Sequence, residues 1–456
     1  MPIRRATELV LAIIGAALPL AGCGAPVKDR IALVGVTVID GTDAPAREDQ
    51  VVIIRGSKID TIAPTAGFII PKTATVLDLK GKWVIPGLID VDGAVERWAI
   101  PRYLAFGVTA VRDVGNDQDS ILALAEAASL HSLVSPRLFV TGAALDGTPP
   151  FDPSSAALAS EAAARRAVDD RIQGGATFVS VGPELSQAEL RAVIDEATSL
   201  NTAVTARLGL TDARTAAKLG IKSLLELSGV PQSVVDPAPF YAAFHRSPWN
   251  GWSATERAWA GLDSAPLGAV ATDLATAGVT LVPALVLHDT WSRLDDSSVT
   301  ASPDLAYVPA SARDDWDLAK FEAQAGWDPS SFPAFRAGRS KEDLFLREFK
   351  LAGGRVAVGT GAAHLLLVPG LSVHREMELL VDAGLPPDDA IRAATSVAAA
   401  LLGADSLGTL EPGKVADLLV LDADPRADIR NTRKIRKVVL GGAVLDADSL
   451  VHRIER

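Results

Sequence analysis

The sequence predicts an α/β protein: a TIM-like (β/α)8 barrel with a small β-sandwich domain formed by both ends of the chain. Across residues 87–403, short apolar runs alternate with amphipathic helical segments, which is typical of parallel strands joined by helices. Residues 31–86 and 404–456 instead carry short β-branched runs separated by glycine turns. The 456 residues exceed the roughly 250 that such a barrel needs.

The first 22 residues predict a lipoprotein signal peptide. Arg4 and Arg5 precede an apolar run over residues 9–20, and Leu-Ala-Gly-Cys follows at residues 20–23. This run is shorter than the ~20 residues that cross a bilayer. We therefore expect cleavage after residue 22, lipidation of Cys23 and a short tether over residues 23–30. The alternative is a buried helix with an incidental cysteine.

Cys23 is the single cysteine, so a disulfide within the chain is excluded. A lipid on Cys23 would anchor the exported chain to a bacterial membrane. Gly24 rather than Asp follows the cysteine, and by similarity to Gram-negative lipoproteins this favours the outer membrane if the source is Gram-negative.

Composition excludes one class of partner. Hydrophobic residues make up 48% and charged residues 22%, which is typical of a folded globular protein. The formal net charge is −12, and no basic face for a phosphate backbone is evident. Nucleic acid is therefore not an expected partner.

Eight candidate strands build the predicted barrel. They are a strand before Asp90 and residues 110–112, 137–141, 178–181, 203–207, 223–226, 280–285 and 356–359. One intervening helix is well specified, because Ser186 and Glu189 form a capping box ahead of an apolar face over residues 190–197. Barrel active sites lie at the carboxyl ends of the strands, so the residues after each strand are the candidates for chemistry.

Residues 231–345 do not show this compact alternation of strands and helices, and they predict an insertion over the barrel mouth. Six of the eight tryptophans lie in this region: Trp249, Trp252, Trp259, Trp291, Trp316 and Trp327. Their side chains could line a binding cleft, or they could pack the insertion against the barrel.

Several motifs resemble the amidohydrolase superfamily, especially its imidazolonepropionase-like and prolidase-like metal-dependent hydrolases. Residues 83–90, WVIPGLID, resemble the start of the barrel in that superfamily. Further matches are VTVIDG at 36–41, FGVTAVRD at 106–113, VPGL at 368–371 and GTLEPGKVADL at 408–418. The resemblance covers about residues 31–447 and implies the barrel fold, with hydrolysis of carbon–nitrogen bonds in active members.

The resemblance also implies a metal centre in active members. Its ligands are a His-x-His pair after the first strand, often a carboxylated Lys after the fourth, a His after the fifth and sixth, and an Asp after the eighth. The corresponding positions here are Asp92 and Ala94, Ser180, Arg207, Glu226 and Gly361. The resemblance therefore implies that nearly every metal ligand has been replaced.

The residues at these six positions offer few donor atoms for a metal. A catalytic zinc takes about three protein ligands, and only Asp92 and Glu226 could serve. A fixed guanidinium repels a dication and suits carboxylates, so we expect Arg207 to supply the positive charge that the metal supplies in relatives. No metal cofactor is expected, although the superfamily binds zinc or another divalent metal. Without a metal, water at neutral pH is a poor nucleophile.

Two histidines leave a second interpretation open. His288 follows the seventh candidate strand and His364 the eighth, so both could face the mouth. They could support acid–base chemistry or bind a metal together with Asp92 and Glu226, or they could be polar rim residues without a catalytic role.

Two functions follow. The first is a catalytically silent relative, a pseudoenzyme, retained as a membrane-tethered binding or partner subunit. It would bind a small amide or peptide-like ligand and assemble with itself or with an active paralogue. The second is a hydrolase of carbon–nitrogen bonds with a rebuilt site of Asp92, Arg207, Glu226, His288 and His364. No Gly-x-Ser-x-Gly motif or glycine-rich phosphate loop is evident, so serine hydrolase and nucleotide-binding functions have little support.

Overall fold

The computed structural model describes residues 29–130 and 132–454. The predicted signal peptide, Cys23 and most of the tether over residues 23–30 lie outside these residues. Within the described part of the chain, no helix combines the length and the apolar character needed to cross a bilayer.

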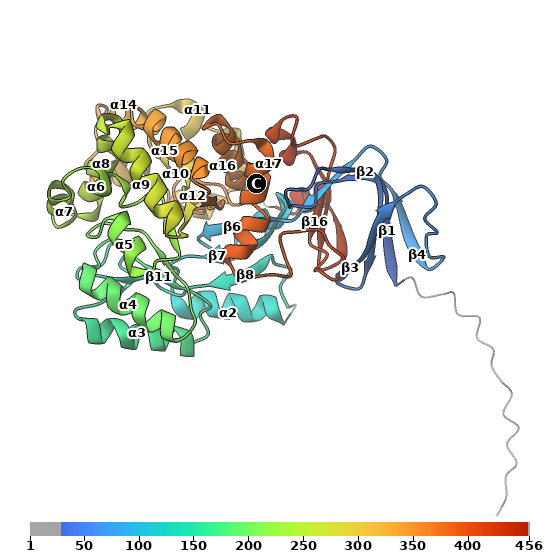
Figure 1. Ribbon diagram of the computed structural model, residues 1–456, viewed down its shortest axis with the longest axis horizontal. Helices are drawn as coiled ribbons and strands as arrows, with labels where there is room; N and C mark the ends of the chain where they lie inside the picture. Colours follow the sequence, from blue (N-terminus) through green and yellow to red (C-terminus); the bar gives the residue numbers. More distant parts are fainter. Residues whose placement is uncertain (1–28, 131, 455–456) are drawn as a thin grey trace, which may run out of the picture.

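Strands from both ends of the chain share one mixed sheet at one end of the molecule (Figure 1). They are β1 (Arg30–Val38), β2 (Arg47–Arg55), β3 (Lys58–Pro64), β4 (Ala74–Asp78), β5 (Trp83–Pro86), β16 (Leu418–Leu421), β17 (Ile435–Leu440) and β18 (Ala443–Asp446). The order is β18-β17-β16-β5-β1-β2-β3, and β4 also pairs with β1.

The predicted two-layered sandwich is not confirmed, because hydrogen bonds join all eight strands in a single sheet. The reason lies in β1, which pairs with β2 along one edge and with both β4 and β5 along the other. The antiparallel pairing of β5 with β16 then connects the two ends of the chain.

All eight candidate strands of the barrel are present. They correspond to β6 (Leu88–Gly93), β7 (Val108–Asp113), β8 (Arg137–Val140), β11 (Val179–Val181), β12 (Val204–Ala206), β13 (Ser223–Leu225), β14 (Thr280–Val282) and β15 (Arg355–Val356). Two short strands were not predicted, β9 (Leu145–Asp146) and β10 (Ala156–Ala157). Every pairing among these strands is parallel.

These strands form two sheets, β6-β7-β8 and β10-β9-β11-β12-β13-β14-β15. Backbone hydrogen bonds connect them at both edges. Val91 N donates to Val358 O at 3.0 Å, and Thr177 N donates to Val140 O at 2.8 Å. The fold is therefore a parallel α/β arrangement consistent with a TIM-like barrel.

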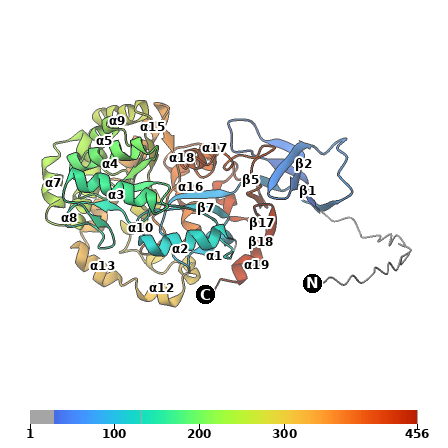
Figure 2. The same ribbon diagram turned by 90° about the horizontal axis from the view of Figure 1, so that it is seen from below.

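Helices surround these strands (Figures 1 and 2). They include α1 (Ile100–Ala105), α2 (Gln118–Ser129), α3 (Glu161–Gln173), α4 (Gln187–Ser199), α5 (Ala213–Leu219), α9 (Ser264–Thr276), α15 (Arg339–Leu351), α16 (Leu371–Asp382), α17 (Pro387–Ala393) and α18 (Ser396–Leu401). The capping box of α4 is confirmed: the Ser186 hydroxyl accepts from Glu189 N, and the Glu189 carboxylate accepts from Ser186 N. Near the C-terminus lie η3 (Ile429–Arg433) and α19 (Ala447–His452).

The insertion predicted over residues 231–345 is not a single segment, because α9 and β14 lie inside it. Before them come α6 (Val230–Val234), α7 (Ala238–Phe244), α8 (Pro248–Ala258) and η1 (Trp259–Gly261). After them come α10 (Leu285–Trp291), α11 (Ser297–Thr300), η2 (Pro303–Tyr307), α12 (Ala310–Asp314), α13 (Leu318–Ala325) and α14 (Ser331–Arg336). This region therefore consists of two helical excursions, the first over residues 230–261 before α9 and the second over residues 285–336 after β14.

Candidate functional site

A cavity of about 550 Å³, here called the mouth cavity, collects residues from the strand ends. Its polar lining includes Ser180 on β11, Arg207 after β12, Glu226 after β13 and His364 after β15, and Ala94 lies beside them. These residues are far apart in sequence. They meet because parallel strands bring their carboxyl ends to one edge.

Arg207 and Glu226 form an ion pair at this cavity. Arg207 Nη2 lies 2.5 Å from Glu226 Oε1, and the exposed fractions of the two side chains are 25% and 5%. Burial alone raises the pKa of Glu226, but the Arg207 guanidinium outweighs it and holds the pKa below the ordinary value. Both groups are therefore charged at neutral pH.

The backbone at Glu226 is unusual. Its φ is 56°, and the φ of Leu227 is 50°, a left-handed conformation uncommon for residues other than glycine. Glu226 N donates to Val282 O at 2.8 Å, so the neighbouring strand β14 fixes this turn. The turn directs the carboxylate toward Arg207.

Asp92 lies deeper than Glu226 and does not line the mouth cavity. It is 2% exposed, and among the described residues its Oδ2 has no hydrogen-bond partner. Burial raises its pKa to about 6, with the attraction of Arg207 opposing the rise and the repulsion of Glu226 adding to it. The two backbone N–H groups of Thr360 and Gly361 donate to the Asp92 carbonyl and hold the residue beneath the mouth.

Arg207 was expected to supply positive charge to both acidic groups. Its ion pair is with Glu226 and none forms with Asp92 among the described residues, but its charge still attracts the Asp92 carboxylate. A second guanidinium also lies near Asp92. Arg112 on β7 is almost fully buried, and its Nε donates to Val91 O at 2.7 Å. Arg112 belongs to the FGVTAVRD motif, but its residue type gave no signal that its side chain turns inward beneath the mouth.

His364 and Gly361 belong to the loop after β15. The His364 side chain is exposed in the wall of the mouth cavity. Gly361 has a φ of 67°, a conformation that favours glycine, and a Cβ there would meet Leu287 Cδ1 at 2.8 Å. Gly361 therefore serves the backbone of this loop and offers no side chain to the site.

His288 does not face the mouth as expected, because α10 turns its ring into the protein interior. The residue is 4% exposed and does not line the mouth cavity. His288 Nδ1 lies 3.0 Å from Glu256 Oε1, and Nε2 lies 3.2 Å from the backbone oxygen of Glu226. Although burial alone lowers the pKa of His288, Glu256 raises it to about 10.

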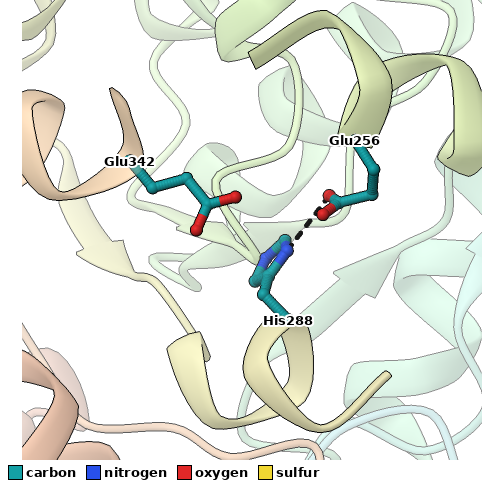
Figure 3. Close-up of side chains that lie close together, drawn as sticks. All are labelled: Glu256, His288 and Glu342. Atoms are coloured by element: carbon teal, nitrogen blue, oxygen red, sulfur yellow. Dashed lines mark ion pairs between the residues drawn. The ribbon is translucent and has the colours of Figure 1, made fainter. Parts of the chain in front are cut away.

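Glu342 on α15 completes a cluster with Glu256 on α8 and His288 on α10 (Figure 3). One possible ligand atom from each residue lies within 4.8 Å of the others, and all three residues are buried. Burial raises the pKa of Glu342 to about 7. Sequence analysis missed both glutamates, because they lie on helices of the irregular region whose facing sides are not evident from residue spacing.

The aromatic residues serve both roles that were left open. Trp249, Trp252, Trp291 and Trp316 line the mouth cavity, whereas Trp259 is fully buried in the core. The ring centroids of Trp249 and Trp291 lie 5.9 Å apart. Trp327 is also buried, and its Nε1 donates to Ser253 Oγ at 2.7 Å. The cavity therefore combines aromatic walls with a charged floor.

Comparison with known proteins agrees with this architecture. Residues 338–445 match the model of the Amidohydrolase family. No curated protein matches the chain by sequence. Three solved structures resemble most of it. A Xaa-Pro dipeptidase with bound methionine is 20% identical, with 91% of this chain and 100% of that chain covered and a TM-score of 0.68.

The other two solved structures resemble this chain over a comparable length. A protein from Bifidobacterium longum, described as a prolidase, is 22% identical over 94% of this chain and 100% of that one, with a TM-score of 0.68. Bottromycin amidohydrolase is 21% identical over 92% and 88%, with a TM-score of 0.73. Residues 338–445 thus match part of the Amidohydrolase family model, and the fold of the chain is similar to that of these solved structures.

The Arg207–Glu226 pair predicts a large effect on stability. We expect Arg207→Ala to lower the free energy of unfolding by roughly 3 to 5 kcal/mol, because it leaves a buried carboxylate without its partner. The double variant Arg207→Ala/Glu226→Gln should recover part of the loss. Urea unfolding followed by tryptophan fluorescence measures both. A single variant as stable as the parent would show that the pair contributes nothing.

Replacing the Asp92 carboxyl is predicted to raise the free energy of unfolding in a pH-dependent way. Its folded pKa of about 6 exceeds the ordinary value of 3.8, so ionisation destabilises the fold, with no cost below pH 3.8 and the full cost above pH 6. We expect Asp92→Asn to be more stable than the parent by about 3 kcal/mol at pH 7, since the pKa rise is about 2 units and one pKa unit corresponds to about 1.4 kcal/mol.

The gain should vanish near pH 4 in the same unfolding experiment. Asp405→Asn, which removes an exposed carboxylate, is the matched control and should show no such trend. An Asp92→Asn variant less stable than the parent at pH 7 would contradict the assignment.

Proposed function

We propose that this protein is a binding member of the amidohydrolase fold, with its eight barrel strands closed into a (β/α)8 barrel. Its mouth cavity would hold a small amide or peptide-like ligand without metal-dependent hydrolysis. The observation that carries the proposal is the ion pair of Arg207 Nη2 with Glu226 Oε1, 2.5 Å apart at the strand ends.

The residues around this pair do not fit the superfamily's metal. Ala94 offers no donor atom, Ser180 offers only a hydroxyl, and the Glu226 carboxylate is engaged by a guanidinium. Of the six positions that correspond to the superfamily's ligands, Asp92 alone then offers a carboxylate without an ion pair among the described residues, which falls short of the roughly three protein ligands that a catalytic zinc takes. The metal-ligand replacement inferred from the motifs therefore has physical support from the charges at the mouth.

The same cavity supports the proposed ligand class. Its volume of about 550 Å³ lies in the range of small-molecule sites. Arg207 and Lys320 can donate to a ligand carboxylate, and the tryptophans supply apolar walls for a side chain. The acidic residues of the lining can accept hydrogen bonds from the N–H groups of an amine or amide; they are Asp146, Asp152, Glu226, Asp315 and Asp317. A peptide-like molecule offers both kinds of group.

His364 favours a second candidate function, a carbon–nitrogen hydrolase with a rebuilt site. Its side chain is exposed in the same cavity as Glu226 and Arg207, where it could move a proton to or from a ligand. His288 does not belong to this candidate site, because its ring faces Glu256. The remaining candidates are Asp92, Arg207, Glu226 and His364.

We further propose that the mature chain is an exported lipoprotein, anchored through Cys23 to a bacterial membrane. In a Gram-negative source this would be the outer membrane. The support is the lipobox-like sequence at residues 20–23. Assembly with itself or with an active paralogue would make it a partner subunit.

Binding can be tested directly. We expect at least one member of a panel of dipeptides and N-acyl amino acids to bind the purified chain in calorimetry, with no turnover by mass spectrometry. Trp316→Ala should weaken binding about 5- to 10-fold, since it removes an aromatic contact from the cavity wall.

Trp83→Ala is the matched control, since Trp83 lies on β5 in the other sheet, and it should bind as the parent does. Turnover that persists in chelator and disappears in His364→Ala would replace the binding proposal with the rebuilt hydrolase. Failure of the whole panel to bind would refute the ligand class.

The lipid anchor has its own test. Intact-mass spectrometry of the membrane-extracted chain should show loss of residues 1–22 and an added acylated glyceryl group on Cys23. Cys23→Ser should keep its signal peptide and lose the lipid. An unmodified Cys23 in the mature parent would end this proposal.

A further inference from the structure

We propose that Glu256, His288 and Glu342 form a buried site for a divalent first-row transition-metal cation such as zinc, separate from the mouth cavity. The three side chains come from α8, α10 and α15 and converge in Figure 3. Each residue is at most 4% exposed, and one possible ligand atom from each lies within 4.8 Å of the other two.

The His288 ring is oriented as a metal ligand. Its Nε2 lies 3.2 Å from the backbone oxygen of Glu226, where an N–H can donate. Histidines that bind metals commonly donate their second N–H to such a carbonyl, which leaves the other nitrogen free to coordinate. That other nitrogen, Nδ1, is the one that faces Glu256.

Nδ1 has no hydrogen-bond partner among the described residues. Glu256 Oε1 lies 3.0 Å away but outside hydrogen-bonding geometry, so the contact is an ion-pair distance only. Two ligands of a tetrahedral zinc with bonds near 2.0 Å are about 3.3 Å apart, which is close to this separation. This buried nitrogen therefore faces the Glu256 carboxylate as an ion pair but has no well-aligned hydrogen bond among the described residues.

The carboxylates also need a partner. His288 is the one ion-pair partner of Glu256 in the described chain, and Glu342 has neither an ion pair nor a side-chain hydrogen bond there. Arg339, one turn before Glu342 on α15, pairs instead with Asp343 at 2.7 Å. Burying carboxylates without donors is costly. A dication bound to two carboxylates and a neutral imidazole leaves the cluster with no net charge.

The donor set indicates the kind of cation. One imidazole nitrogen with two carboxylates suits zinc and neighbouring transition metals, whereas magnesium and calcium prefer oxygen ligands alone. A small cavity of about 30 Å³ has room for a water; it is lined by Glu256 but not by His288 or Glu342, and its lining also includes Arg207 and Glu226.

Such a cation would join helices from both sides of β14. It would hold α8 of the first excursion against α10 and α15, which follow β14. Trp252 on α8 stacks on His288 with ring centroids 6.4 Å apart, and it also lines the mouth cavity. The site is therefore structural, and it positions an aromatic wall of the ligand cavity.

Metal content and stability test the site. The full-length chain is extracted from zinc-supplemented cells in detergent without chelators, and its metal is measured by elemental analysis. We expect about one zinc per chain. After chelation, adding zinc should raise the thermal midpoint by several degrees. Glu256→Gln and Glu342→Gln should each bind zinc at least 10-fold more weakly and show little stabilisation by it.

Two control variants locate the metal. Glu348→Gln changes another glutamate of α15 outside the cluster, and Asp92→Asn changes the acidic residue beneath the mouth, so both should retain the zinc. Loss of zinc in Asp92→Asn but not in Glu342→Gln would place the metal at the mouth. That result would overturn both this inference and the metal-independent function proposed above.

X-ray absorption at the zinc edge of the parent needs no variant and remains decisive if the glutamine variants fail to fold. One imidazole with oxygen ligands supports the site, whereas two or more imidazoles overturn it. Less than 0.1 zinc per chain, together with no zinc-dependent stabilisation, would also overturn it. The cluster would then be a protonated histidine between two glutamates, and the proposed function of the mouth cavity would be unaffected.

Discussion

The ion pair between Arg207 and Glu226 is the interaction on which the interpretation of the mouth depends. It places a permanent cation at the strand ends and keeps Glu226 ionised despite its burial. Among the described residues Asp92 Oδ2 has no hydrogen-bond partner, and burial raises the pKa of that carboxyl. A buried pair of this kind contributes little net stability, but removing one member is strongly destabilising. Once such a pair is present, a change at either residue requires a matching change at the other.

Much of the fold could be predicted because its signals are local. Apolar runs, turn glycines and the capping box at Ser186 each act within a few residues, and all eight barrel strands were found from them. The residues of the mouth could be predicted as a group because parallel strands bring their ends together. The connection through β1 could not, since pairing on both its edges depends on contacts distant in sequence.

Side-chain direction was the main thing that residue spacing did not reveal. His288 follows β14 closely, as expected, but α10 begins at Leu285 and turns the ring inward toward α8 and α15. The partners Glu256 and Glu342 lie on either side of β14 in sequence, so no motif joins them. Arg112 could be assigned to a strand, but not to the buried polar layer beneath the mouth. In each case the missing information was the packing of one helix or strand against another.

Two polar centres therefore lie on opposite sides of one aromatic wall. Trp252 contributes to the mouth cavity on one side and stacks on His288 on the other, while the Glu226 backbone oxygen contacts the same imidazole. The family model matches residues 338–445, whereas the structural similarity extends over at least 91% of the chain. Sheet formation tolerates wide sequence change as long as the apolar pattern is kept, but metal binding requires particular donors at particular positions. The same fold can thus carry different charge arrangements at its strand ends, and in this chain Arg207 and Glu226 form an ion pair there.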